Sequence, residues 1–220
     1  MGSRQCYAPA MPQPSEVVIR DLRPSDVGPS VDLLTQAFAD FPVLAIAVGH
    51  DAASAGRLKR MFAMDFEPDA GNDAIVAELV GEVVGVLTFA DSPRCSEMSA
   101  GRMLRFTRIV GTRIFGAVRM FGRIDRVHPK IPHRHLPSVG VSPRRQGAGI
   151  GRQLMDEFHR RCDADGALGY LETVRWSDPG KPSLERFYQG LGYQIRHVVP
   201  MQDDWQVLTM MRSPAAAAEA

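Results

Sequence analysis

Apolar positions along the chain follow two periods, which divide it into helices and strands. A spacing of three to four residues predicts helices at about 26–38, at 51–66, over 99–127 with a break near Gly111 or Gly116, at 150–162 and, in short form, at 183–190. Short apolar runs predict strands at 17–19, 74–79, 83–89, 136–141, 168–173, 193–199 and 205–211. The order β-α-α-β-β-α-β-α-β-α-β-β predicts an α/β fold built on a mixed sheet.

Capping residues, prolines and glycines set several boundaries of these elements. Ser25 or Asp26 is expected to cap the first helix, and Phe41-Pro42 to end or turn it. Gly81-Glu82 lies between two apolar runs and predicts a β-hairpin. The strand at 168–173 should run parallel to that at 136–141, because a helix connects them. Gly192 is expected to end the short helix, and the last two strands to pair antiparallel.

The segment 141–152 carries the clearest chemical signal. A strand ends at Val141, Arg144 and Arg145 follow in a short turn, and Gly147, Gly149 and Gly151 lead into an amphipathic helix. Such a turn points backbone N–H groups and the positive end of a helix dipole at one place. Glycines allow close approach to the backbone, and the arginines add mobile positive charge. The segment predicts a site for a phosphate or diphosphate.

Composition and charge narrow the class of protein. A net charge of +1 gives no general attraction to nucleic acid or membranes, and no apolar run is long enough for a membrane span. Three widely separated cysteines argue against a disulfide framework or a zinc site and fit a reducing compartment. We therefore expect a cytoplasmic protein that binds neither nucleic acid, membrane nor metal. We also expect a disordered leader at 1–15, one domain at 16–213 and a disordered tail at 214–220.

Three motifs in order carry a family resemblance covering roughly residues 17 to 212. They are Gln146-Gly147-Ala148-Gly149-Ile150-Gly151 with the preceding strand, the run Leu171-Glu172-Thr173, and the later run from Phe187 to Tyr193. With these the chain resembles the GNAT superfamily of acetyl-CoA-dependent N-acetyltransferases. Ala37-Phe38-Ala39-Asp40-Phe41-Pro42 makes it most similar to the puromycin N-acetyltransferase-type members.

The resemblance implies a central sheet splayed open, with helices on both faces and acetyl-CoA wedged in the splay. The diphosphate would lie on the glycine turn and the pantetheine along the free edge of the strand at 139–141. A backbone amide near Val139 or Gly140 would hold the oxyanion, and Phe38 and Phe41 would help to choose the acceptor. The implied cofactor-binding residues are Val139, Gly140, Val141, Arg144, Arg145, Gln146, Gly147, Ala148, Gly149, Ile150, Gly151, Arg152 and Ser183.

Acetyl transfer needs a base for the acceptor ammonium and an acid for the leaving thiolate. By the resemblance, Tyr188 matches the general acid, although a buried core tyrosine would have the same pattern. His135 occupies the position at which many relatives carry a glutamate that acts as the general base, and a histidine can accept a proton near neutral pH. His133 and Glu172 are the alternative bases, and exposed loop histidines are the plain structural alternative.

The acceptor is not readable from the sequence. A small-molecule primary amine is expected from the resemblance, while a peptide N-terminus and a lysine side chain stay open as acceptors. A homodimer is also left open. A non-catalytic acyl-CoA sensor is a rival, because fold alone does not settle function. A dinucleotide enzyme is a weaker rival, since the glycines start too far beyond the strand end.

Arginines interleave with apolar residues at 102–126, which favours a helix packed on its own domain over a membrane-bound one.

Overall fold

The computed structural model describes residues 16–92, 99–178, 180–181, 183–202 and 204–215. The expected leader and the expected tail beyond residue 215 lie outside these residues. The strands are β1 (Val18–Asp21), β2 (Asp73–Leu79), β3 (Glu82–Asp91), β4 (Arg134–Val141), β5 (Gly169–Trp176), β6 (Gln194–Gln202) and β7 (Trp205–Arg212). The helices are α1 (Val27–Ala37), α2 (Pro42–Val48), α3 (Ser54–Met64), α4 (Ala100–Val110), α5 (Ile114–Asp125), α6 (Ile150–Ala164) and α7 (Glu185–Gly190).

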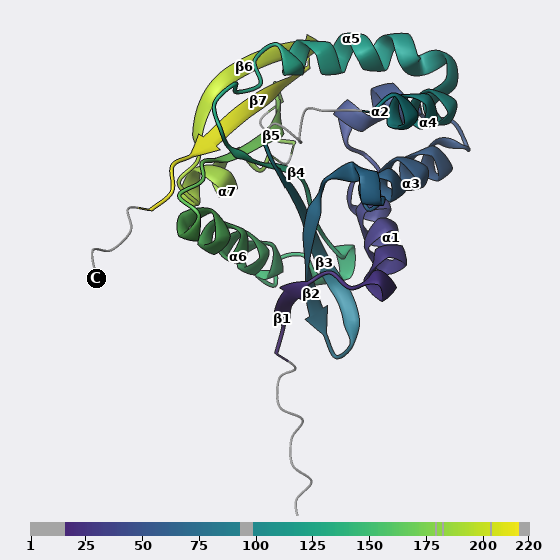
Figure 1. Cartoon of the computed structure of the whole chain (residues 1–220). Coiled ribbons are helices and arrows are strands. Elements are labelled where there is room, and N and C mark those ends of the chain that lie inside the picture. Colours follow the sequence, from purple (N-terminus) through teal and green to yellow (C-terminus); the bar gives the residue numbers. More distant parts are fainter. Residues whose placement is uncertain (1–15, 93–98, 179, 182, 203, 216–220) are drawn as a thin grey trace, which may run out of the picture.

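One seven-stranded sheet in the order β1-β2-β3-β4-β5-β7-β6 organises the fold. The pairing of β4 with β5 is parallel, and every other pairing is antiparallel. Helices α6 and α7 lie on one side of the sheet, α1 to α4 lie on the other, and α5 reaches across to β6 (Figure 1). The mixed α/β fold with helices on both faces is therefore confirmed.

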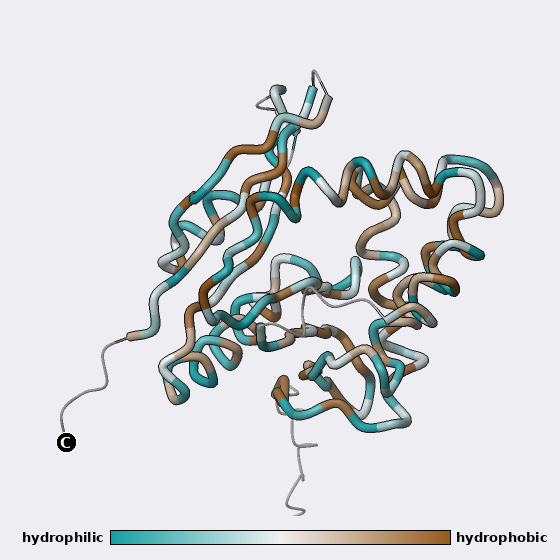
Figure 2. The backbone as a smooth tube through the Cα atoms, turned by 45° about the horizontal axis from the view of Figure 1, so that its top comes forward, coloured by the Kyte–Doolittle hydropathy of each residue, from teal (hydrophilic) through white to brown (hydrophobic). Residues whose placement is uncertain are grey.

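Apolar side chains fill both sides of this sheet. Leu154, Met155 and Phe158 of α6 are completely buried against the strands, as the four-residue repeat of that helix predicts. On the other face, Leu34 of α1 packs with Phe62 of α3. Figure 2 shows brown apolar residues recurring along the helices and strands between teal polar ones. The core thus holds the central strands rigidly from both sides.

Two local predictions at the start of the chain hold only in part: Asp26 is the residue before α1, and the chain turns between α1 and α2. Asp26 does not cap α1 with its side chain, because its carboxylate bonds the guanidinium of Arg20 at 2.6 Å and the backbone N–H of Arg23 at 2.7 Å. Pro42 does not simply end a helix; it begins the separate helix α2, a position that its fixed φ favours. The break at Gly111 between α4 and α5 and the positive φ of Gly192 are as predicted.

The parallel contact between β4 and β5 is short. Arg134, His135 and Leu136 pair with Gly169, Tyr170 and Leu171, and no pairing between the two strands is seen beyond that point among the described residues. On its other side β4 stays paired with β3 as far as Val141. The edge of β4 over residues 137–141 is consequently left open toward β5.

No single helix in the described part of the chain is long and apolar enough to cross a membrane. Among the described residues, residues 24–37 and α2 are together long and apolar enough, but the two segments are bent by 106° to each other.

Candidate active site

The glycine turn follows directly from the end of β4. Gly147 and Gly149 have φ of 81° and 79°, a left-handed conformation that glycine adopts without strain. A Cβ added at either position would meet no other atom within 4 Å, so the turn faces open space. No side chain caps α6 at Gly149, and the first turn of the helix holds no acidic residue. The amides at the start of α6 are thus suited to an anion.

The remaining turn residues surround these amides. Arg144, Arg145, Ala148 and Arg152 are exposed, as is Gln146, whose side-chain amide donates to the carbonyl of Val141 at 3.4 Å. Ile150 is buried and anchors the helix in the core. Gly151 has no positive φ, and a Cβ there would touch Val141 only at ordinary distance. Gly147 and Gly149 therefore determine the shape of the turn.

The open edge of β4 adjoins this turn. The side chains of Val139 and Val141 pack against the core on the α6 side. Gly140 faces the opposite side, where a Cβ would come within 3.0 Å of Leu34 and 3.1 Å of Leu33. The absence of a side chain at Gly140 lets α1 lie close to β4. A linear ligand with amide groups could pair with the open edge, since free strand groups need partners.

His135 lies where β4 and β5 diverge, on the face that carries α1 to α5. Strand β4 begins at Arg134, so the interpretation of His135 as a loop residue is wrong. Its Nε2 donates to the carboxylate of Glu172 on β5 at 2.8 Å. The parallel register that pairs His135 with Tyr170 places Glu172 next to it.

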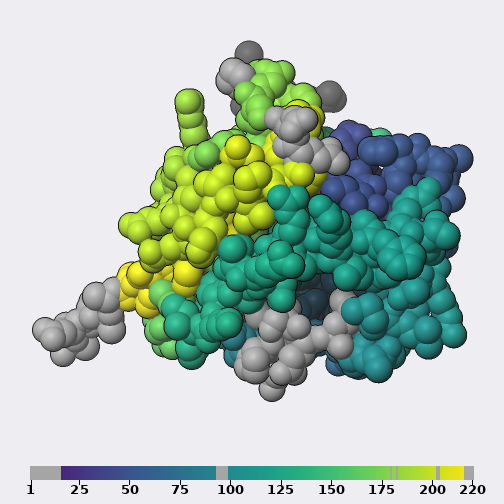
Figure 3. Space-filling model, turned by 90° about the horizontal axis from the view of Figure 1, so that it is seen from above, coloured from purple at the N-terminus to yellow at the C-terminus, as the bar shows by residue number. Residues whose placement is uncertain are grey.

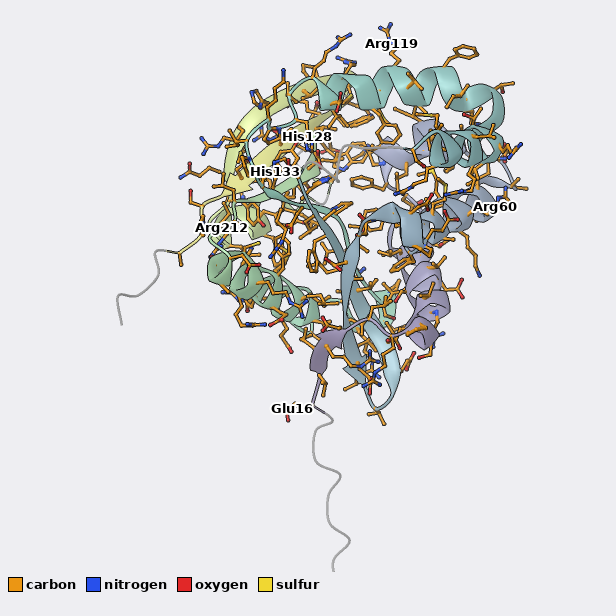
Figure 4. The ribbon with its side chains drawn as sticks, in the orientation of Figure 1. Glu16, Arg60, Arg119, His128, His133 and Arg212 are labelled. Carbon is orange, nitrogen blue, oxygen red and sulfur yellow. The ribbon has the colours of Figure 1, made fainter. Side chains whose placement is uncertain are left out.

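Two more histidines belong to the same cluster. His133 Nε2 lies 3.1 Å from His128 Nε2, and His128 Nδ1 lies 3.8 Å from Glu172. The ring of Tyr170 packs edge-on against His128 and His133 and at a tilt against His135. Figure 4 shows His128 and His133 close together beside the central strands. The sequence interpretation named His133 and Glu172 as alternative bases but did not assign a role to His128 or Tyr170.

The pKa values of two carboxyl groups near His135 are shifted in opposite directions. Burial alone would raise the pKa of Glu172, but the positive charge that His135 carries when it is protonated, together with hydrogen bonds from His128, His135 and Tyr170, outweighs burial and lowers that pKa. Burial raises the pKa of Asp65 to about 7, against the opposing charge of Arg102 and that of His135 in its protonated form. Asp65 follows α3 and lies 3.8 Å from Arg102 of α4. No sequence pattern marks Asp65, which comes near His135 only through the packing of the helices.

Tyr188 lies on α7 with only 4% of its surface exposed. It belongs to the core cluster that also contains Leu136 of β4 and Leu171 of β5. Burial raises the pKa of its hydroxyl well above the ordinary value, so the phenol stays protonated. Ser183 accepts from the backbone N–H of Glu185 at 3.2 Å and donates to the carbonyl of Val174 at 3.3 Å. Its hydroxyl thus supports the start of α7, and a contact with the cofactor stays a prediction.

Phe38 and Phe41 are half-buried and in contact with each other. Their ring centroids are 5.3 Å apart, and the ring of Phe38 lies 5.4 Å from that of Phe62. The three rings join the ends of α1 and α3 to the start of α2. Their role in choosing the acceptor stays a prediction.

The arginines of α4 and α5 serve mostly internal contacts. Arg105 pairs with Glu67 and Asp69, Arg113 pairs with Asp51, and Arg123 bonds the carbonyls of Pro200 and Met201 in β6. Phe106, Met120 and Ile124 pack into the domain, as the sequence favoured. Leu104, Phe115 and Val118 are exposed, so that prediction holds only in part. Arg119 points away from the molecule (Figure 4). Figure 3 shows the surface hollowed beside the teal segment that contains these helices.

A separate open pocket of about 710 Å³ lies at the opposite end of β4 from the glycine turn. Arg134, Arg160 and Arg161 line it together with Asp21 and Asp165. Its arginines already pair with carboxylates, Arg134 with Asp91 and Asp165 and Arg161 with Asp21 and Glu157. The glycine turn, with uncapped amides and no acid in the helix's first turn, is the better anion site.

Over the described residues, no group of three His, Cys, Asp or Glu side chains is arranged to hold a metal ion.

Comparison with known proteins agrees with this geometry. The family model described as "Acetyltransferase (GNAT) domain" matches residues 70–195. The N-alpha-acetyltransferase RimI of Mycobacterium tuberculosis is 32% identical over 129 residues, which cover 50% of this chain and 77% of RimI. The narrower likeness to the puromycin type stays a prediction.

Solved structures share the fold at low sequence identity. A histone acetyltransferase HPA2-related protein from Corynebacterium glutamicum superposes with a TM-score of 0.66 at 23% identity, covering 92% of this chain and 98% of its own. The structure of yncA from Salmonella typhimurium, described as an acetyltransferase and solved with acetyl-CoA, superposes with a TM-score of 0.52 at 17% identity. The match covers 92% of this chain and 96% of yncA. With its uncapped glycine turn, its open β4 edge and the family match, this chain belongs to the GNAT acetyltransferases and is an acetyl-CoA-dependent N-acetyltransferase.

Proposed function

We propose that the acceptor is a small-molecule primary amine, as the puromycin-type resemblance implies. The observation that carries this proposal is the position of α5, which packs on both α2 and β6 across the end of the sheet. Arg123 fastens the helix to β6 by bonding the carbonyls of Pro200 and Met201. A helix fixed at both sides is proposed to form a wall of the acceptor site, and this favours a compact acceptor over a folded protein.

In the proposed reaction His135 is the general base. Its Nε2 carries a hydrogen because Glu172 can only accept there, so Nδ1 holds the lone pair. Nδ1 takes one proton from the acceptor ammonium, and the amine nitrogen then attacks the thioester carbonyl carbon. The new C–N bond forms as the C–S bond breaks. The leaving thiolate takes the hydroxyl proton of Tyr188, whose buried phenol is held neutral. The attacking nitrogen loses its second proton as the amide forms, and through solvent that proton restores the phenol of Tyr188.

The backbone supplies the remaining interactions of the proposed site. Amides at the start of α6 hold the diphosphate, Arg144 and Arg145 add charge to the phosphates, and the open β4 edge pairs with the pantetheine. A backbone N–H near Val139 or Gly140 stabilises the oxyanion that develops at the thioester carbonyl. Phe38 and Phe41 form part of the wall against which the acceptor packs.

A polypeptide N-terminus is the second candidate acceptor. It is favoured by one specific observation, the similarity to RimI, an N-alpha-acetyltransferase. Such an acceptor presents an extended chain rather than a compact body, so it would have to pass beside α5.

An acceptor screen separates the two candidates. Release of free CoA thiol from acetyl-CoA is measured against a panel of small primary amines and a panel of short peptides with free N-termini. The proposal predicts that kcat/KM is highest for small amines. Preferential turnover of peptides would replace it with the second candidate, and thiol release with neither panel would contradict amine acetylation as the function.

A further inference from the structure

The hydrogen bonds of the three histidines fix which ring nitrogens carry hydrogen. His133 Nδ1 lies 2.8 Å from the carbonyl oxygen of Ile131, which can only accept, so this nitrogen carries a hydrogen. In a neutral His133 the other nitrogen, Nε2, is then an acceptor. It lies 3.1 Å from His128 Nε2, which must therefore donate.

The remaining nitrogen of His128 faces a carboxylate. His128 Nδ1 is 3.8 Å from Glu172, and a lone pair there would be repelled by the negative charge. A hydrogen on Nδ1 makes the contact attractive, and His128 is then protonated on both nitrogens. The side chains of His128 and Glu172 are only 13% and 20% exposed, so solvent screens the contact weakly.

The geometry points to a division of charge within this site: His128 is the imidazolium partner of Glu172, and it thereby keeps His135 neutral and able to accept a proton. This inference rests on the proposed role of His135. Glu172 lies between the two rings, whose centroids are 5.4 Å apart. A cation on His128 offsets the carboxylate and repels a second proton on His135. His128 is thus a positioning residue that sets the charge of the base without contacting the acceptor.

The other charged groups near His135 come from three elements. Asp65 follows α3, Arg102 lies on α4 next to Asp65, and Glu172 with Tyr170 comes from β5. All of these side chains, and His133 beside them, are kept when His128 is replaced, although Glu172 and His133 lose their contact with His128. A change in the protonation of His135 in such a variant therefore reports the loss of the His128 charge.

Nitrogen-15 NMR of histidine-labelled full-length protein tests the assignment without any acceptor. At pH 7.5, His128 should show both ring nitrogens protonated, and His135 should show the neutral form with hydrogen on Nε2. In the His128→Asn variant the pKa of His135 should rise by about one unit or more, because Glu172 then acts on it alone. A neutral His128 together with an unshifted His135 in the variant would overturn the inference.

Kinetics supply a second readout and a matched control. The acidic limb of the pH profile of kcat/KM, where activity falls as His135 is protonated, should move to higher pH in His128→Asn. The move should equal the rise in the pKa of His135. His159→Asn removes another buried histidine, on α6, and should leave the limb in place. If His128→Asn lowers thermal stability, Tyr170→Phe is also measured, since it keeps the packing of the ring and the charge of His128 and should leave His135 neutral at pH 7.5. NMR shifts without any amine turnover would contradict the proposed function alone; turnover with an unmoved limb would contradict the inference alone.

Discussion

His135 Nε2 lies 2.8 Å from Glu172 Oε2, beside Leu136–Leu171, the last parallel pair of β4 and β5 among the described residues. Beyond this contact the two strands separate, so the imidazole stands at the mouth of the opening in the sheet. The carboxylate fixes the tautomer of the ring and directs its other nitrogen away from Glu172.

Replacing His135 by asparagine should remove the base while keeping a polar side chain. We expect kcat/KM for a good amine to fall by at least about 100-fold, the usual contribution of a positioned base. The dissociation constant of acetyl-CoA, measured by calorimetry, should stay within about twofold, because the cofactor is held by the glycine turn. A pH–rate profile identical to that of the wild type would rule out this role.

Replacing Gly149 by alanine should weaken acetyl-CoA binding. The left-handed conformation costs a non-glycine residue about 1–2 kcal/mol, and the added Cβ enters the space left for the diphosphate. We expect the dissociation constant to rise on the order of tenfold. Gly81→Ala is the matched control, since Gly81 also has φ of 79° and open space around it but lies in the β2–β3 turn. Both variants should lose similar free energy of unfolding, and equal affinity for acetyl-CoA in the two would contradict the proposed site.

Replacing Tyr188 by phenylalanine should lower kcat by about 10- to 100-fold and change KM little, because the hydroxyl acts on the leaving thiolate. Tyr193→Phe is the control: Tyr193 is equally buried and its hydroxyl lies 3.3 Å from His159. An unchanged kcat in Tyr188→Phe would leave Tyr188 as a core residue only.

Asp65 should make the stability of the fold depend on pH. Its pKa is raised by burial from 3.8 to about 7, so the folded state binds the proton more tightly than the unfolded state does. Its contribution to stability is therefore present below about pH 4 and is lost as pH rises to about 7. Asp65→Asn should raise the free energy of unfolding at pH 8, measured with urea, by about 1 kcal/mol or more. The gain should disappear at pH 4, and an equal gain at both values would be inconsistent with this assignment.

The glycine turn and the strand–helix–strand unit around it are predictable from sequence because their signals are local. Gly147 and Gly149 need their φ values for the turn itself, and the four-residue repeat of α6 is set by one buried face. The pair His135–Glu172 needs more information, because the two residues are 37 positions apart and meet through strand register. Asp65 and His128 reach the site only through tertiary packing. The turn at Pro42 was predicted, but the helix that begins there was missed, because a proline can follow one helix or begin another.

A crystal structure of the protein with acetyl-CoA tests the central claim most directly. The account predicts that diphosphate oxygens accept hydrogen bonds from backbone amides within residues 146–152. It also predicts that the thioester lies in the opening between β4 and β5, on a line of approach from His135. A diphosphate bound elsewhere, for example by Arg134, Arg160 and Arg161 at the other end of β4, would contradict it.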